Sequence, residues 1–182
     1  MDPERFAQLI ARAGDKAFNF AFRLSGSEAD ARDLVQESFM RALEHFSDYD
    51  PSRPFDSWVL KILHNIYLDS VKRHGYSRTV SIDAPTSLED TDWADLLPEK
   101  SPSAAEELIK EENLDLLAQA LKKIPLVYRS AVTLCDIEGL SYEEISKVMN
   151  IPVGTVRSRI HQGRVLLKQA FEALEKSRGK LS

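Results

Sequence analysis

The sequence holds one cysteine, Cys135, among 182 residues, so no disulfide can form within the chain. This usage fits a reducing compartment, and we expect a cytoplasmic protein. No apolar run approaches the roughly 20 residues that a membrane-spanning helix needs, and the opening MDPERFAQLI lacks the features of a signal peptide. We therefore expect no direct insertion into a membrane. Seven glycines and eight prolines are too few for a fibrous or a wholly disordered chain.

Residue patterns typical of catalytic sites are also missing. The histidines, His45, His64, His74 and His161, are far apart and lack the close partner spacing of zinc ligands. No glycine-rich loop indicates nucleotide binding, and no motif presents a nucleophile with its partners. Cys135 falls on an apolar face and is interpreted as a small core residue. We expect a protein that is not an enzyme, with no catalytic residues, no cofactor and no metal site.

Acidic and basic residues are segregated along the chain. The net charge of −5 argues by itself against binding to nucleic acid. Yet no acidic residue occurs between Ile145 and Phe171, and a local basic patch governs docking more than the total charge does. The stretch from Asp83 to Glu99 has the opposite bias, with several acids, no lysine or arginine, and prolines near both ends. No helical or strand period persists there, so we predict a linker between two domains.

Two helices joined by a tight turn are predicted between Gly139 and Lys168. Ser141 and Glu144 form a capping-box pattern at the start of the first helix. Asn150 suits a left-handed helix end, and Pro152 prevents continuation of the first helix while suiting the start of a second. The second helix carries an apolar stripe at helical spacing: Val156, Ile160, Gly163 and Leu167.

The other face of this second helix carries basic, amide and hydroxyl side chains: Arg157, Ser158, His161 and Gln162. Arginine and glutamine can each pair with a base edge through two hydrogen bonds in the major groove, where positive charge also meets phosphates. The pattern therefore favours a DNA-binding helix-turn-helix. The alternative is a surface helix pair whose basic face is merely solvated.

The part before the linker is also predicted to be helical, with helices at Pro3–Leu24, Glu28–Phe46 and Phe55–Arg73, and helices resume near Ala104. No strand pattern is convincing anywhere. The predicted fold is therefore all-α, with two small helical domains joined by an acidic flexible linker. The C-terminal domain is expected to be a helix-turn-helix, winged-helix-like but without a sheet.

The helix predicted at Phe55–Arg73 carries a polar stripe of Lys61, Asn65, Asp69 and Lys72. Basic residues then gather around its end: Lys72, Arg73, His74 and Arg78. One interpretation is that these cations stabilise the C-terminus of the helix. The other is that they contact phosphates or a single strand of nucleic acid.

Two motifs in order resemble the extracytoplasmic-function (ECF) group of bacterial sigma-70-type sigma factors, the initiation subunits of RNA polymerase. Asp33 to Phe39, followed by Phe55 to Trp58, is similar to the second region of that family. Gly139 to Ile145, with Ile151 to Arg159, is similar to the fourth region. The resemblance implies a region 2 domain at 1–82, a linker at 83–103 and a region 4 domain at 104–182.

The resemblance also implies a role for each set of residues. Docking on the clamp helices of the largest subunit of core RNA polymerase is implied for Asp33, Gln36 and Glu37. Contact with the melted minus-10 promoter element is implied for Lys61, Asn65, Asp69, Lys72, Arg73 and Arg78. Base reading in the minus-35 duplex is implied for Arg157, Ser158, His161 and Gln162. Phosphate contact there is implied for Thr155, Arg159 and Arg164.

Three further expectations follow from the resemblance. His161 and Gln162 stand where arginine and aromatic residues are common, so the preferred promoter is expected to differ from the commonest family consensus. The acids Glu89, Asp90, Asp92 and Asp95 are expected to mimic RNA in the polymerase channel. An anti-sigma factor is expected to bind the chain. Two rival functions are a stand-alone helix-turn-helix repressor or activator and a helical protein that only regulates polymerase.

Overall fold

The computed structural model describes residues 3–73 and 115–178. The N-terminal part contains α1 (Pro3–Ser25), α2 (Glu28–Glu44), the 3-10 turn η1 (Phe46–Asp48) and α3 (Phe55–Arg73). The C-terminal part begins with helical residues 115–123 and continues through α5 (Leu126–Val132), the π-helical turn η3 (Thr133–Ile137), α6 (Tyr142–Met149) and α7 (Val153–Arg178). No strand occurs within the described ranges, which confirms the all-α prediction.

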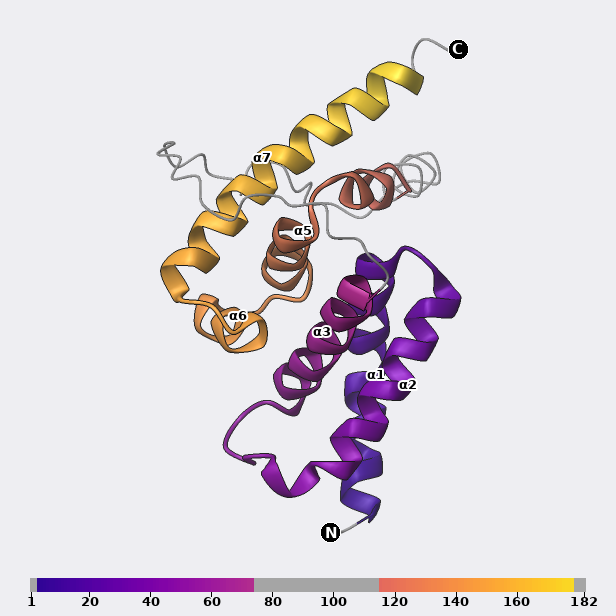
Figure 1. Ribbon diagram of the computed structural model, residues 1–182, viewed down its shortest axis with the longest axis vertical. Coiled ribbons are helices and arrows are strands. Elements are labelled where there is room, and N and C mark those ends of the chain that lie inside the picture. The colour runs from indigo at the N-terminus through magenta and orange to yellow at the C-terminus, as the bar shows by residue number, and fades with distance from the viewer. Residues whose placement is uncertain (1–2, 74–114, 179–182) are drawn as a thin grey trace, which may run out of the picture.

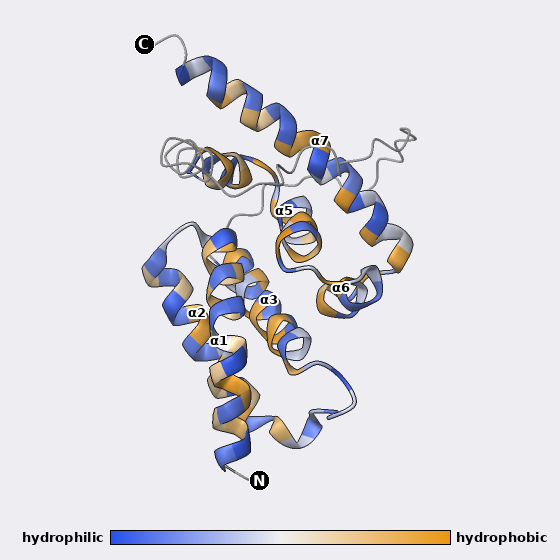
Figure 2. Cartoon of the chain, turned by 180° about the vertical axis from the view of Figure 1, so that it is seen from behind, coloured by the Kyte–Doolittle hydropathy of each residue, from blue (hydrophilic) through white to orange (hydrophobic). Residues whose placement is uncertain are grey.

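The helices α1, α2 and α3 pack together as one group, and α5, α6 and α7 form the other (Figure 1). Each helix combines hydrophobic and hydrophilic residues, as expected for helices that bury one face (Figure 2). The predicted linker from Asp83 to Glu99 lies outside the described residues, as do Arg78 and the acids expected to mimic RNA.

The sharp turn between α1 and α2 is set by local sequence. Gly26 adopts a φ of +72°, a left-handed conformation that ends α1. Ser27 then caps α2, because its side chain accepts a hydrogen bond from the backbone N–H of Asp30 at 3.3 Å. The turn lays α2 back along α1. Apolar side chains from α1 and α3, among them Phe20 and Leu63, are completely buried between the helices.

The predicted caps of the helix-turn-helix are confirmed. The Ser141 hydroxyl accepts a hydrogen bond from the Glu144 backbone N–H, and Glu144 Oε2 accepts one from the Ser141 N–H at 2.8 Å. Asn150 ends α6 in the left-handed conformation, with φ 54° and ψ 50°. Pro152 lies just before α7, and its carbonyl accepts the first helical hydrogen bond from Val156. These local features fix the angle between α6 and α7.

The long helix α7 packs against α5 at a glycine of α7, Gly163, which has no side chain. Val156, Ile160 and Gly163 are buried along this line, as the sequence pattern predicts. A Cβ atom on Gly163 would lie 2.5 Å from Val132 Cγ2 and 3.1 Å from the Tyr128 carbonyl oxygen. The glycine therefore sets the close approach of the two helices.

The two helical groups are packed against one another, chiefly through α3 and α6. A continuous cluster of buried side chains extends from Phe6 in α1 to Ile160 in α7. Cys135 is half-buried against this cluster, in line with a structural role, and burial raises the pKa of its thiol to about 11. The relative placement of the two groups was not accessible from the sequence.

We predict that Gly163→Ala destabilises the protein although alanine is the better helix former. The new methyl group collides with the branched and buried Val132 side chain, and overpacking of this kind costs about 1–3 kcal/mol. Urea denaturation measures the change in the free energy of unfolding. The matched control is Gly154→Ala in the first turn of the same helix, where a Cβ meets nothing within 4 Å. The account is wrong if both variants are stabilised equally.

Candidate nucleic-acid interface

The N-terminal half of α7 places its predicted DNA-binding residues on different sides of the helix. Arg157 and Ser158 are exposed, and the Ser158 hydroxyl donates to the Gly154 carbonyl oxygen at 3.1 Å. The remaining predicted residues are half-buried: Thr155, Arg159, His161, Gln162 and Arg164. Arg157 is thus the most accessible cation among the seven residues predicted to contact the minus-35 element.

Arg159 leans toward the body of the protein. Desolvation lowers the pKa of its guanidinium, and the nearby Tyr128 hydroxyl on α5 partly opposes this change. Arginine remains charged under all ordinary conditions, so the result is a positive charge held close to α5 and α3. Burial is the main cause that lowers the pKa of His64 on α3 to about 4, and the nearby positive charge of Arg159 adds to this effect.

Arg164 is engaged by an acidic partner. Its Nε and Nη2 atoms donate to the two carboxylate oxygens of Asp136 at 3.0 and 2.6 Å. This fork geometry orients the guanidinium strongly, and the hydrogen bonds raise its pKa. A phosphate could approach Arg164 only by sharing it with Asp136. His161 lies one turn earlier, and its Nε2 atom is buried without a hydrogen-bond partner.

The polar stripe on α3 is present as predicted. Lys61, Asn65, Asp69 and Lys72 are all exposed, and Arg73 is exposed just beyond them. Asp69 lies 3.9 Å from Lys72, and its carbonyl oxygen accepts from Arg73 Nε at 3.3 Å. Lys72 is thus the counter-charge nearest the Asp69 carboxylate, whereas Arg73 contacts the backbone of Asp69.

On α2, the residues predicted to dock on polymerase share the outer surface. Asp33 and Gln36 are exposed, whereas Glu37 is half-buried and forms an ion pair with Arg41 at 2.6 Å. Sequence reasoning missed an apolar groove of about 540 Å³ beside them, whose lining includes Phe39, Met40 and Leu43. Met40 and Leu43 are 57% and 43% exposed. Helical spacing places Gln36, Met40 and Leu43 on one face of α2 but does not tell whether that face is buried or exposed.

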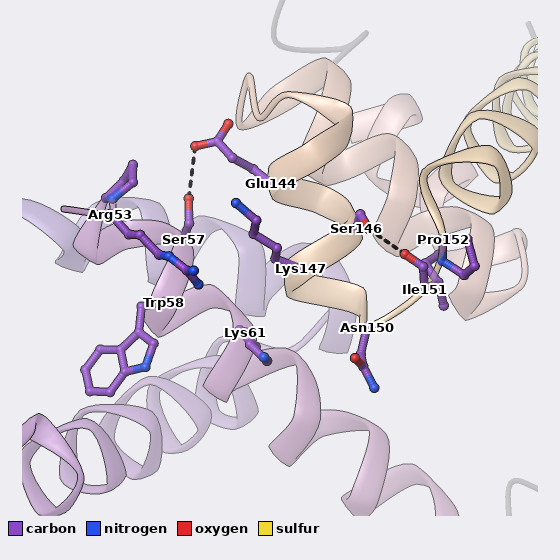
Figure 3. Close-up of a pocket in the computed structure, with 11 residues that line it drawn as sticks. Arg53, Ser57, Trp58, Lys61, Glu144, Ser146, Lys147, Asn150, Ile151 and Pro152 are labelled. Carbon is purple, nitrogen blue, oxygen red and sulfur yellow. Dashed lines mark hydrogen bonds between the residues drawn. The ribbon is translucent and has the colours of Figure 1, made fainter. Parts of the chain in front are cut away.

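The two groups of helices enclose a further pocket, of about 530 Å³, between the start of α3 and the helix-turn-helix (Figure 3). From α3 it is lined by Ser57, Trp58 and Lys61, the first residue of the minus-10 stripe. From the other side it is lined by Glu144, Ser146, Lys147, Asn150, Ile151 and Pro152. The Ser57 hydroxyl donates to Glu144 Oε1 at 3.3 Å across this junction. No local sequence pattern indicates this pocket, because Ser57 and Glu144 are 87 positions apart.

Family comparisons match both helical groups. Residues 9–76 match the family described as Sigma-70 region 2, and residues 114–167 match Sigma-70, region 4. The chain is 30% identical to the ECF RNA polymerase sigma factor SigW of Bacillus subtilis over 178 residues, which cover 95% of this chain and 92% of SigW. The chain belongs to the ECF sigma factors of the sigma-70 family.

Another relative is the ECF RNA polymerase sigma factor SigE of Mycolicibacterium smegmatis, at 40% identity over 162 residues. The match covers 88% of this chain but 59% of SigE, so this ECF sigma factor spans less than two thirds of that relative. Two solved structures share its fold. One is the sigma factor RpoE in complex with the anti-sigma factor NepR from Bartonella quintana, with a TM-score of 0.68, 20% identity, and coverage of 93% and 98% of the two chains. The other is CnrH in complex with the cytosolic domain of CnrY, at 0.63, 25%, and 94% and 91%.

Within residues 3–73 and 115–178, no helix of this ECF sigma factor is long and apolar enough to cross a membrane.

We predict that His64 makes the stability of this sigma factor depend on pH. Its folded-state pKa of about 4 lies below the ordinary value of 6.5, so the unfolded chain takes up the proton first as the pH falls. Stability contributed by the neutral imidazole is therefore present above pH 6.5 and lost between there and pH 4, by about 2 kcal/mol at about pH 5.

The free energy of unfolding is measured in urea at about pH 7.5 and about pH 5, for the natural chain and for His64→Leu. The substitution removes the titrating group and breaks no hydrogen bond of Nδ1, because that atom has no partner. The natural chain should lose more stability than the variant between the two pH values. Equal losses would show that the imidazole is not buried in its neutral form.

Proposed function

We propose that this ECF sigma factor binds core RNA polymerase and directs promoter-specific initiation of transcription through minus-10 and minus-35 elements. The observation that carries the proposal is the exposed Arg157–Ser158 surface of α7, in a stretch without acidic residues, on a helix held by the confirmed caps of a helix-turn-helix. The match to SigW over 92% of its length supports the same function.

The proposed division of labour follows the domain limits predicted from the sequence. Residues 1–82 would bind polymerase and the melted minus-10 element, 83–103 would serve as the linker, and 104–182 would bind the minus-35 duplex. For the duplex, we propose direct base contact by Arg157 and Ser158, and the exposure of both residues supports this. The half-buried His161 and Gln162 would read neighbouring bases, and Thr155, Arg159 and Arg164 would hold phosphates.

For the minus-10 element, we propose the exposed α3 stripe of Lys61, Asn65 and Asp69, with the cations of Lys72, Arg73 and Arg78 near the melted strand. Protonated amines suit phosphates, while an amide or a carboxylate can pair with a base edge that has left the duplex. Asp33, Gln36 and Glu37 on α2 would dock on the clamp helices of the largest polymerase subunit. The function proposed is binding and positioning, with no reaction catalysed and no cofactor.

Regulation is proposed from the relatives. RpoE was solved with the anti-sigma factor NepR, and CnrH with the cytosolic domain of CnrY. We propose that an anti-sigma factor also controls this chain, in the cytoplasm. The direct test of the whole function is transcription from a defined promoter with purified core polymerase. The rival repressor would shift promoter DNA without core enzyme, whereas a sigma factor should need it.

We predict that Arg157→Ala weakens binding to the minus-35 duplex in a base-specific manner, by about 1–3 kcal/mol. The measurement compares holoenzyme on cognate and scrambled minus-35 sequences. The matched control is Lys176→Ala, which removes an exposed cation from the far end of the same helix. Equal loss on both duplexes would show that Arg157 contacts phosphate rather than a base.

We predict that Asp33→Lys weakens binding to core polymerase by about 1–3 kcal/mol, because it places a cation against basic partners. Fluorescence anisotropy titration with core enzyme would measure the dissociation constant. Glu28→Lys changes the charge equally at an exposed position of the same helix and should leave that constant nearly unchanged. If both variants weaken binding alike, net charge rather than a local contact explains the effect.

A further inference from the structure

The pocket between the start of α3 and the helix-turn-helix has a hydrogen-bonded turn in each wall. On the α3 side, the Tyr49 hydroxyl donates to the Arg53 carbonyl oxygen at 2.7 Å, and the Arg53 N–H donates to the Asp50 carbonyl oxygen at 3.0 Å. On the other side, the Ser146 hydroxyl donates to the Ile151 carbonyl oxygen at 2.6 Å, and the Ile151 N–H donates to the Ser146 carbonyl oxygen at 3.1 Å. Turns held in this way need little ordering when a ligand enters, which favours binding.

Positive charge gathers in this pocket. Its lining includes three cations, Arg53, Lys61 and Lys147, and one carboxylate, that of Glu144. Arg53 and Lys61 come from the wall that contains α3, and Lys147 comes from α6 in the opposite wall (Figure 3). The Glu144 carboxylate is already engaged, because it caps α6 and accepts a hydrogen bond from Ser57. The pocket therefore has a surplus of positive charge.

These cations are accessible to a ligand. Lys61 and Lys147 form no ion pair with any residue of the ranges 3–73 and 115–178. Arg53 pairs with Asp50 through Nε at 3.3 Å, and its side chain remains 63% exposed, so the guanidinium can still approach further oxygens. Like charges that face one cavity repel each other, and an anion with several negative charges would relieve this repulsion. An arginine together with two lysines suits the oxygens of phosphate groups.

The rest of the lining also suits a phosphorylated molecule. The pocket lies at the starts of α3 and α7, where N–H groups without helical partners and the helix dipole favour negative charge. The end of α6 has the opposite polarity, but its last turn carries Lys147. Trp58 lines the α3 wall and packs against Tyr49 and Phe55, with ring centroids 5.2 and 5.7 Å from its own. The indole provides an apolar surface against which a planar ring can pack.

We propose that this pocket binds a small phosphorylated anion, whose phosphate groups contact Arg53, Lys61 and Lys147. The cavity of about 530 Å³ has the size usual for a small-molecule site. Two sources share this chemistry: a nucleotide, whose base would pack on Trp58, and an inorganic polyphosphate. The proposal goes beyond the proposed function and does not rest on it, although Lys61 also belongs to the proposed minus-10 stripe.

The first experiment is isothermal titration calorimetry of the full chain with ATP and with inorganic tripolyphosphate, both without divalent cations. Both probes should bind, and their affinity should fall as the salt concentration rises, because the contacts are ionic. Binding of ATP that is tighter by roughly threefold or more assigns the site to nucleotides, because the base adds an aromatic contact. An ATP affinity that is equal or weaker assigns the site to inorganic polyphosphate. Binding of neither probe at about 1 mM would overturn the proposal.

The second experiment removes one cation from each wall. Arg53→Gln combined with Lys147→Gln should raise the dissociation constant of both probes roughly tenfold or more, because charge-assisted hydrogen bonds are lost. Lys61 is kept, so the residues proposed to contact DNA are unchanged. Arg12→Gln with Lys168→Gln is the control, because it changes the net charge equally at exposed positions outside the pocket. Equal weakening in the control would show that net charge alone attracts the probes, and the site would be wrong.

The single variants test whether the anion contacts both walls. Arg53→Gln and Lys147→Gln should each weaken the binding of tripolyphosphate roughly threefold or more. A loss in only one of them would place the anion on one group of helices and overturn the two-sided site. Thermal unfolding followed by circular dichroism checks that each variant folds. A saturating probe should also raise the unfolding temperature of the natural chain, and an unchanged temperature would contradict binding.

Discussion

The close approach of α7 to α5 at Gly163 determines how the other surfaces of the C-terminal domain are presented. It fixes the rotation of α7 about its own axis, because Val132 and the Tyr128 backbone leave no room for a side chain there. With that rotation set, Arg157 and Ser158 point to solvent while Arg159 lies beside α5. A packing constraint without charge thus selects which of the basic residues of α7 are exposed to solvent.

The same constraint gives the basic residues of α7 different electrostatic settings. Arg164 is held by both oxygens of Asp136, and Arg159 is partly desolvated, whereas Arg157 is exposed. A guanidinium already paired with a carboxylate gains less from a phosphate than a solvated one does, because the existing hydrogen bonds must be shared. The basic residues of this stretch therefore differ in accessibility in the folded chain: Arg164 is held by a carboxylate, Arg159 is partly desolvated and Arg157 is exposed.

Features that depend on neighbouring residues could be predicted from the sequence. The capping box of Ser141 and Glu144 and the left-handed Asn150 are local, since each requires only a few consecutive residues. The same holds for the exposed polar stripe of α3, which follows from helical periodicity alone. The family resemblance added the functional grouping, which no single helix carries by itself.

Features that depend on packing between distant segments could not be predicted. The partnership of Arg164 with Asp136 requires the rotation of α7 on α5, and 28 positions separate the two residues. The contact of Ser57 with Glu144 requires the placement of one domain on the other. Met40 and Leu43 look like ordinary helix residues until the core face of α2 is known, and only then does their exposure become informative.

Glu144 serves two neighbours through separate oxygens. Oε2 accepts from the backbone and the hydroxyl of Ser141 at 2.8 and 2.9 Å, whereas Oε1 accepts from Ser57 at 3.3 Å. Losing Ser57 would therefore leave the helix start intact, while replacing the carboxylate would disturb both neighbours. Position 144 is therefore pleiotropic: a substitution there alters both how the two groups of helices associate and how α6 begins, whereas the hydrogen bond of Ser57 involves the association alone.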